Sequence, residues 1–256
     1  MWRWPVVQWK KDLSNAAKQK VFSLHAKLIA LAATNWSDPE LNPALSDAIE
    51  KAKKDNVPND NIERAIKKWA WLDKSSEQVS QIIYEWYAPG WVAVIIQTLT
   101  DNKNRTASNI RHIFSKFWWN MWESGSVAWI FERKWVIYLD KNKIDFEKLE
   151  EFVFETEAEN IIVNNDEIQI ICHLDNLKNL WNQLMEKWFK YTDSKLEYIA
   201  SNEIEISEFD KALKIIKMIE ALEEDEDIED YSINAIINDD LKKEVIDFIE
   251  KNTFKT

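Results

Sequence analysis

Apolar residues recur every three or four positions through the first third of the chain, the spacing of an amphipathic helix. Asn42-Pro43 favours the start of a second helical stretch, and Asn59 or Asp60, after Pro58, favours the start of a third. The predicted helices are Asp12–Ala33, Asn42–Lys54 and Asn61–Lys68, and together they form a three-helix module.

After Ser76 the apolar pattern changes to short runs and to alternation, which indicates strands. The predicted strands are Gln81–Trp86, Val92–Thr98, Val127–Phe131, Val136–Leu139, Asn160–Asn164, Glu167–His173, Leu196–Ala200, Glu203–Ile206 and Tyr231–Ile237. The helices expected between and after them are Thr106–Lys116, Asp145–Phe154, Asn176–Lys187, Ser207–Leu222 and Asp240–Lys251.

The six elements from Val136 to Ala200 follow the order βαββαβ of a ferredoxin-like unit. A second unit of similar plan begins at Val92 and is completed by the elements after residue 200. The Val136–Ala200 unit is therefore inserted in this second unit. We therefore predict an α+β protein: a helical domain at 1–76, a discontinuous α+β domain at 77–132 and 201–238, an inserted ferredoxin-like domain at 133–200, and a helical extension at 239–256.

The composition holds 2 glycines and 15 tryptophans, although glycine averages about 7% and supplies most backbone positions with positive φ. Several tryptophans stand where turn glycines are typical, as in Pro89-Gly90-Trp91. We hypothesise that fourteen of them are glycine in the native protein, from a gene whose UGA codons mean glycine. Trp129, in an apolar run, is the one interpreted as genuine. The alternative is a Trp-rich surface that stacks on bases or sugars.

Charge is distributed unevenly along the chain. Residues 1–135 carry 19 Lys and Arg against 14 Asp and Glu, whereas residues 136–256 carry 14 against 31, for a net charge of −12. The N-terminal half could present a cationic face to phosphates while the acidic half is solvated. Surface charge that serves only solubility is the alternative.

Catalytic and metal-binding patterns are missing from the sequence. Cys172 and His173 are adjacent on a predicted strand and would point to opposite faces, and His112 is expected to be a partly buried helix residue. The acidic run Glu223–Asp230 lacks the spacing of a calcium loop and is interpreted as a solvated loop. We predict no enzyme activity, no cofactor and no metal. With no leader or membrane-spanning run, we expect a soluble cytoplasmic protein.

Two cation-rich segments are candidates for contact with phosphates. Arg64, Lys67 and Lys68 lie within two turns of the third predicted helix, where a solvated helix face is the alternative. The loop that holds Lys103, Asn104 and Arg105 links a strand to a helix and could bind an anion. Alternatively, Asn104 or Thr106 only caps that helix and Asp101 pairs with Arg105. Lys10, Lys11, Lys18 and Lys20 would extend the footprint, with Lys10 and Lys11 alternatively part of a disordered tail.

Three segments together resemble the signature segments of the YebC family: Asn56–Lys68, Asp101–Thr106 with Thr100, and Ser124–Trp129. The resemblance spans about residues 2–237 and implies three domains around a shared cleft. Family members carry glycine at positions occupied here by nine tryptophans, which agrees with the recoding hypothesis: Trp36, Trp69, Trp71, Trp86, Trp91, Trp118, Trp119, Trp122 and Trp135. They carry Trp at Trp129. The N-terminal segment Trp4–Lys11 departs from the more basic family pattern, and the stretch after Asp239 extends beyond the family's usual end.

The YebC family includes bacterial proteins called transcriptional regulators and a mitochondrial translational activator. The resemblance therefore implies a non-enzymatic regulator of gene expression that binds nucleic acid. Its target is DNA at promoters or, alternatively, RNA on the ribosome. A third alternative is a protein-binding scaffold that uses the acidic half against a basic partner.

Overall fold

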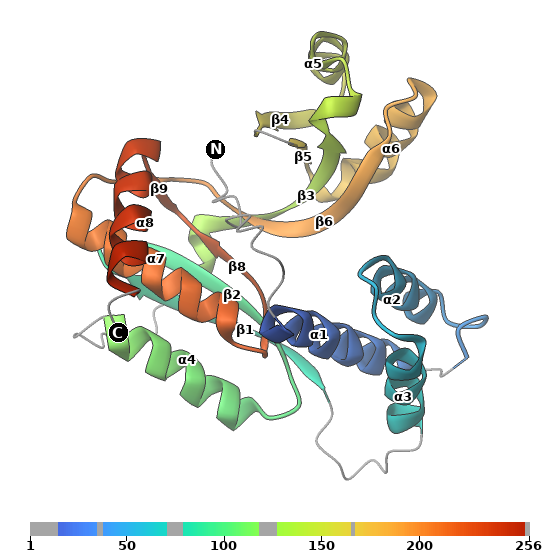
Figure 1. Cartoon of the computed structure of the whole chain (residues 1–256). Helices are drawn as coiled ribbons and strands as arrows, with labels where there is room; N and C mark the ends of the chain where they lie inside the picture. The colour runs from blue at the N-terminus through green and yellow to red at the C-terminus, as the bar shows by residue number, and fades with distance from the viewer. Residues whose placement is uncertain (1–14, 35–37, 71–78, 118–126, 165–166, 254–256) are drawn as a thin grey trace.

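The computed structural model describes residues 15–34, 38–70, 79–117, 127–164 and 167–253. Helices come first, and sheets with packed helices follow (Figure 1). The predicted α+β fold is confirmed. Three hydrophobic clusters account for most of the interior, one in the N-terminal helices and one in each of two sheet-and-helix units.

The N-terminal helices form a bundle around α1 (Asn15–Ala33), which packs against α2 (Pro43–Lys54) and α3 (Asn59–Ala70). Asn42 caps α2, because its side chain accepts a hydrogen bond from the Leu45 amide at 3.2 Å. The same side chain donates to the Ala32 carbonyl at 2.8 Å and so ties the helix start to α1. Helix α2 begins at the predicted Asn42-Pro43, whereas α3 begins at Asn59, two residues before the predicted Asn61, so the prediction that Asn59 or Asp60 caps it is wrong.

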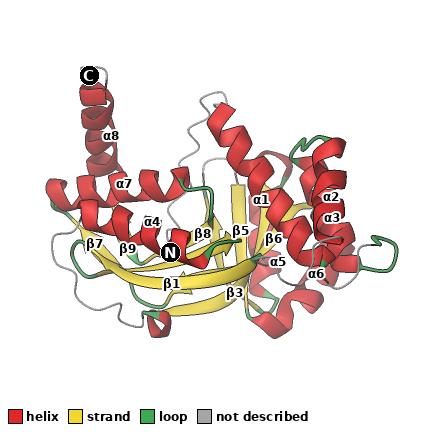
Figure 2. Cartoon of the chain, turned by 90° about the horizontal axis from the view of Figure 1, so that it is seen from below, coloured by secondary structure: helices red, strands yellow, loops and turns green. Residues whose placement is uncertain are grey.

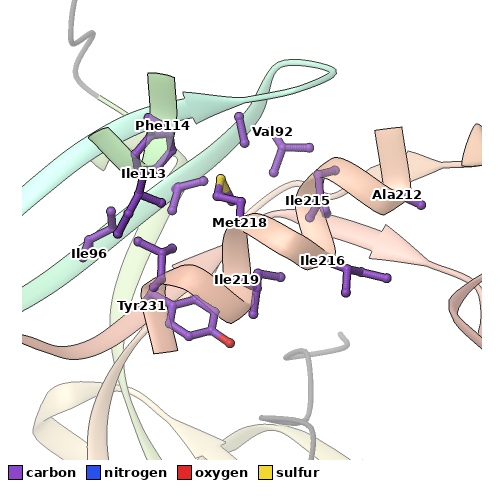
Figure 3. Packing of buried hydrophobic residues seen from close by; sticks show 14 of the residues in the cluster. Val92, Ile96, Ile113, Phe114, Ala212, Ile215, Ile216, Met218, Ile219 and Tyr231 are labelled. Carbon is purple, nitrogen blue, oxygen red and sulfur yellow. The ribbon is translucent and has the colours of Figure 1, made fainter. Parts of the chain in front are cut away.

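A three-stranded antiparallel sheet lies at the centre of the protein, in the order β1-β2-β8. Its strands are Ser80–Ala88, Val92–Thr100 and Ile228–Ile233. Helices α4 (Lys103–Phe117) and α7 (Phe209–Glu224) cover one face (Figure 2). Figure 3 shows Phe114 of α4 and Met218 of α7 packed with Val92 and Ile96 of the sheet. Alternate residues of β2 face this core, which fixes the register of the strand.

Beside this sheet, β7 (Ile204–Ile206) pairs in parallel with β9 (Ala235–Ile237). Helix α8 (Asp239–Thr253) packs on α7 and contributes Val245 to the same core. The predicted C-terminal helix is thus present and joined to the central unit.

The second sheet has the strand order β4-β5-β3-β6, and all its pairs are antiparallel. With α5 and α6 it follows the βαββαβ order along the chain, so its topology is the predicted ferredoxin-like one. The 3-10 turns η2 (Lys141–Lys143) and η3 (Leu174–Asn176) precede its two helices. Its elements are β3 Phe131–Asp140, α5 Phe146–Phe154, β4 Ala158–Val163, β5 Glu167–Cys172, α6 Leu177–Glu186 and β6 Tyr191–Ala200.

The strand predicted at Val127–Phe131 is wrong. Ala128–Ile130 form a single 3-10 turn, η1, and only Phe131 belongs to a strand, β3. The Glu85 carboxylate accepts hydrogen bonds from the Val127 and Ala128 amides, at 2.6 and 3.0 Å, which leaves these amides unable to join a sheet ladder. A short apolar run alone does not distinguish a strand from such a turn.

Two of the suspect tryptophans have the backbone of a glycine. Trp91, in the β1–β2 hairpin, has φ 64° and Trp188, after α6, has φ 63°. At Trp188 the amide donates to the Met185 carbonyl and the next amide donates to the Leu184 carbonyl, a Schellman ending whose left-handed residue is usually glycine. Asn56 has this role after α2, at φ 59°.

Other tryptophans lie in regular structure. Trp86 is in β1, where its ring packs 5.0 Å from that of Phe114, while Trp135 is in β3 and Trp181 in α6. Trp129, interpreted as genuine, is 71% exposed on η1. Trp36, Trp71, Trp118, Trp119 and Trp122 lie outside the described residues, as does the side chain of Trp69.

Candidate nucleic-acid interface

The third helix presents part of its predicted cationic patch to solvent. Arg64 is exposed and, within the described residues, has no ionic partner. Lys67 is also exposed and lies 3.2 Å from the Glu63 carboxylate one turn earlier. Lys18 is exposed on α1. The remaining predicted contacts, Lys10, Lys11 and the side chain of Lys68, lie outside what the structure describes.

The loop before α4 forms a regular helix start. Asn102 is the cap, because its side-chain oxygen accepts from the Arg105 amide at 3.0 Å while its own amide donates to Thr100 Oγ1 at 2.9 Å. The expectation that Asn104 or Thr106 caps this helix is wrong, since the helix begins at Lys103, three residues before the predicted start. Lys103 and Asn104 are left with exposed side chains.

Arg105 is engaged by two carboxylates of the protein itself. Its guanidinium donates to both Asp227 oxygens, from Nη2 at 2.9 Å to each and from Nε at 3.2 Å to one. Nη2 also lies 3.0 Å from Asp101. This geometry favours the alternative in which Arg105 fixes the turn. A role for Arg105 in anion binding stays a prediction.

Asp227 is the centre of this cluster. It is 2% exposed and accepts hydrogen bonds from Lys27 Nζ at 2.6 Å and Thr106 Oγ1 at 2.8 Å in addition to Arg105. Burial alone would raise the pKa of this carboxyl, but the hydrogen bonds from Lys27, Thr106 and Arg105 outweigh it and lower the pKa below the usual value. Asp227 is therefore ionised, and both its oxygens accept hydrogen bonds from groups of the protein.

Lys20 is likewise directed inward. Its ammonium group donates to the main-chain carbonyls of Leu222 and Glu223, at the C-terminus of α7, where the helix dipole favours a cation. Burial lowers its pKa, although Asp225 and Glu223 oppose this effect. The predicted footprint that includes Lys20 thus contains a lysine already held by the protein.

The interpretation of Glu223–Asp230 as a solvated loop is wrong. Helix α7 continues to Glu224 and β8 begins at Ile228, so only a tight turn separates them. Asn109 of α4 donates to Asp225 at 3.1 Å, and the Tyr231 hydroxyl donates to Glu223 at 2.8 Å. The sequence shows the carboxylates but not their partners: Asn109 lies 116 residues from Asp225, whereas Tyr231 lies 8 residues from Glu223.

The outer face of α4 carries cations that the sequence reasoning did not single out. Arg111 and Lys116 are exposed, and so is His112, which was expected to be partly buried. The helix bears no carboxylate, and among the described residues Lys103 and Arg111 have no ionic partner. The signal was available in the sequence, because no acidic residue occurs between Asp101 and Glu123.

The structure does not bring the two predicted cation groups together. Figures 1 and 2 both show α3 and α4 apart, with α1 between them. One rigid patch therefore does not contain Arg64 and Lys103.

Within the described residues, no group of three His, Cys, Asp or Glu side chains is placed to hold a metal ion. No helix in those parts of the chain combines the length and apolar character that crossing a bilayer requires. Cys172 is buried, and burial raises the pKa of its thiol to about 11, so the thiol is protonated at neutral pH.

Comparison with known proteins gives consistent matches over nearly the whole chain. Residues 2–70 match the family described as TACO1/YebC protein N-terminal domain, and residues 79–235 match TACO1/YebC second and third domain. A protein of Thermotoga petrophila named "Probable transcriptional regulatory protein" is 37% identical over 97% of this chain and 98% of its own length. A protein of Syntrophomonas wolfei with the same name is 38% identical over 93% and 96%.

Among solved structures, a conserved hypothetical protein from Aquifex aeolicus is similar in fold and sequence. The TM-score is 0.76 and the identity 35%, over 88% of this chain and 93% of the other. Helix α8 lies beyond the last residue of the matched family domains.

Proposed function

The chain belongs to the TACO1/YebC family, and from that premise we propose that it is a non-enzymatic regulator of gene expression that binds nucleic acid through exposed cations of α3 and α4. Its relatives' name supports regulation of transcription, and we take promoter DNA in the cytoplasm as the target. RNA on the ribosome is the alternative outcome of the test below.

The observation that carries the proposal is the cationic outer face of α4. Lys103 and Arg111 are separated by two helical turns, roughly 12 Å along the axis, with the small residues Ala107 and Ser108 between them. Phosphates attract such cations, and small residues let a sugar–phosphate backbone come close. Because no carboxylate on this helix competes, the face stays cationic although the whole protein carries −12.

We also propose the division into a helical domain, a discontinuous α+β domain and an inserted domain with the predicted boundaries. The three separate hydrophobic clusters support it.

The test compares promoter-fragment duplexes with ribosomes at matched salt. Wild-type protein should bind one of them, and the double variant Lys103→Ala/Arg111→Ala should weaken that binding. Lys178→Ala/Lys190→Ala, which removes two exposed lysines from the inserted unit, is the matched control and should bind as wild type does. Equal weakening by both pairs would show non-specific attraction, and no binding to either target would favour the scaffold alternative.

We further propose that the native protein has glycine at Trp91 and Trp188 and at the other suspect positions. A left-handed backbone costs roughly 1–2 kcal/mol at a residue with a Cβ atom, which a glycine avoids. The intact mass of the protein from its native host should be lower than the printed sequence requires, by up to fourteen Trp→Gly differences. A mass that agrees with 15 tryptophans would end this proposal.

A further inference from the structure

The turn from Leu222 to Asp227 receives cations from a helix that lies about 200 residues earlier in the sequence. Lys20 of α1 donates to the carbonyls of Leu222 and Glu223. Lys27, two turns further along α1, donates to the Glu226 carbonyl at 2.8 Å and to Asp227 Oδ1 at 2.6 Å. The N-terminal helices are thus joined to the central unit by ammonium groups on carbonyl and carboxylate oxygens.

We propose that α1 and the turn Leu222–Asp227 form an ionic latch that holds the N-terminal helical module against the central sheet. Closed, the latch fixes the module in the position that the structure shows. Opened, it leaves the module attached to the rest of the protein by the chain that leads to β1.

The apolar part of this junction is small. Ala30 of α1 is buried with Val79 and Leu99, and Leu28 and Leu31 pack at the edge. The module has a separate core of its own, which includes Ile29, Leu45 and Ile62. Each side therefore has its own hydrophobic cluster, and the ionic contacts contribute a large share of the junction. The Lys27 and Asp227 side chains are only 14% and 4% exposed, and salt screens such buried pairs much less than exposed ones.

The conformation of the turn Leu222–Asp227 is also held by contacts that do not involve α1. Arg105, Thr106 and Asn109 of α4 hold Asp227 and Asp225 on the other side, and the Asp227 amide donates to Asp225 at 2.9 Å. Loss of the α1 lysines would leave this half of the cluster in place. The latch can therefore open without unfolding of the α4 or α7 helices.

The functional consequence rests on the proposed function. The latch sets the separation between Arg64 on α3 and the cations of α4, so its opening would change how the two groups reach one nucleic acid. The latch itself needs no nucleic acid, and a test without nucleic acid separates its failure from that of the proposed function.

The test measures the distance between the module and the body in the full chain. Spin labels are placed at Ser46→Cys on α2 and Lys217→Cys on α7, both exposed positions, while the buried Cys172 does not react. The closed latch gives a narrow distance distribution at low salt. Lys20→Gln/Lys27→Gln should lose that narrow distribution, and Lys18→Gln, an exposed lysine on the same helix, should keep it.

High salt supplies the second measurement. At about 1 M NaCl the wild-type distribution should stay narrow, because the Lys27–Asp227 pair is shielded from solvent and is screened little by salt. Circular dichroism confirms that the helices of both proteins remain folded. A narrow, wild-type distance in the double variant at both salt concentrations would overturn the latch, and so would a Lys18→Gln distribution as broad as that of the double variant.

Discussion

Two groups of cations in the same half of the chain have opposite surroundings. Lys20, Lys27 and Arg105 are held by the turn Leu222–Asp227. In contrast, Arg64, Lys103 and Arg111 are exposed and, among the described residues, have no ionic partner. The sequence presents both groups alike, as basic residues on or beside amphipathic helices.

The difference shows how the positive N-terminal half and the acidic C-terminal half are related. Part of the N-terminal positive charge neutralises a C-terminal turn inside the protein, and only the remainder faces solvent. Removal of one partner of a buried charge pair is destabilising, because it leaves the other charge buried and unpaired. Exposed cations contribute little to stability and stay available for phosphates. We therefore assign the first group to the fold and the second to binding.

The largest expected effect follows Asp227→Ala. This change leaves Lys27, Arg105 and Thr106 without their shared acceptor, and breaking a buried ion pair costs about 3–5 kcal/mol. Chemical denaturation should show a loss of unfolding free energy near the lower end of this range, because the Arg105 side chain is 48% exposed and solvent compensates part of the loss. Glu226→Ala, an exposed carboxylate in the same turn whose main-chain carbonyl accepts from Lys27, is the control and should change stability little.

Removal of the exposed cations gives the next effect. Arg64→Ala/Lys103→Ala/Arg111→Ala should weaken nucleic-acid binding and lower the slope of log affinity against log salt by roughly 2–3, since each lost phosphate contact removes about 0.7–0.9. Each exposed charge contributes at most about 1 kcal/mol to folding, so the melting temperature should stay near that of wild type. An unchanged slope would show that these three residues do not contact phosphates.

Arg105 was predicted to bind an anion, but in the structure it binds Asp227, so it can be assigned to either group. If it serves the fold, Arg105→Ala should cost about 1.5–3 kcal/mol of stability, the value for hydrogen bonds to a charged group, and the folded variant should bind nucleic acid normally. Arg105→Lys should lose less, because one ammonium replaces only part of the two-pronged contact. If it serves as an anion site, Arg105→Lys should instead lose affinity while Lys103→Arg is tolerated.

The smallest predicted effect is a dependence on acidity. The folded-state pKa of Asp227 lies below its unfolded value, so its contribution to stability is complete above pH ~3.9 and is lost as the pH falls through the folded pKa. The stability difference between wild type and Asp227→Asn should therefore shrink below about pH 4. A difference that stays constant between pH 5 and pH 2 would show that Asp227 is not held as an ionised group.

Local signals predicted most of the fold. Asn42-Pro43 placed the start of α2, and Pro58 placed that of α3 to within two residues, because caps and prolines act within a few residues. The apolar run Val127–Phe131 was wrongly predicted as a strand, because Glu85, in a distant strand, accepts hydrogen bonds from the amides of Val127 and Ala128 and stabilises a turn there. A long-range partner decided that outcome, whereas the wrong cap prediction for α4 has a local cause, because Asn102 takes that role.

The candidate site was predictable only in part for the same reason. Exposure of Lys103 and of Lys67 follows from helix position and charge. That Arg105 and Lys20 are occupied depends on Asp227 and on the carbonyls at the end of α7, which no local pattern reveals. The carboxylate-free stretch after Asp101 was a readable signal for Arg111.

The most direct test measures unfolding free energy and nucleic-acid affinity on the same two variants. One variant carries Lys20→Gln, Lys27→Gln and Arg105→Gln, and the other carries Arg64→Gln, Lys103→Gln and Arg111→Gln, so that each loses three positive charges. Our assignment predicts that the first loses stability and, at temperatures where it is folded, still binds through the α4 cations Lys103 and Arg111, whereas the second keeps its stability and loses binding. Equal losses of affinity in both variants would contradict the assignment, because net charge alone would then explain binding.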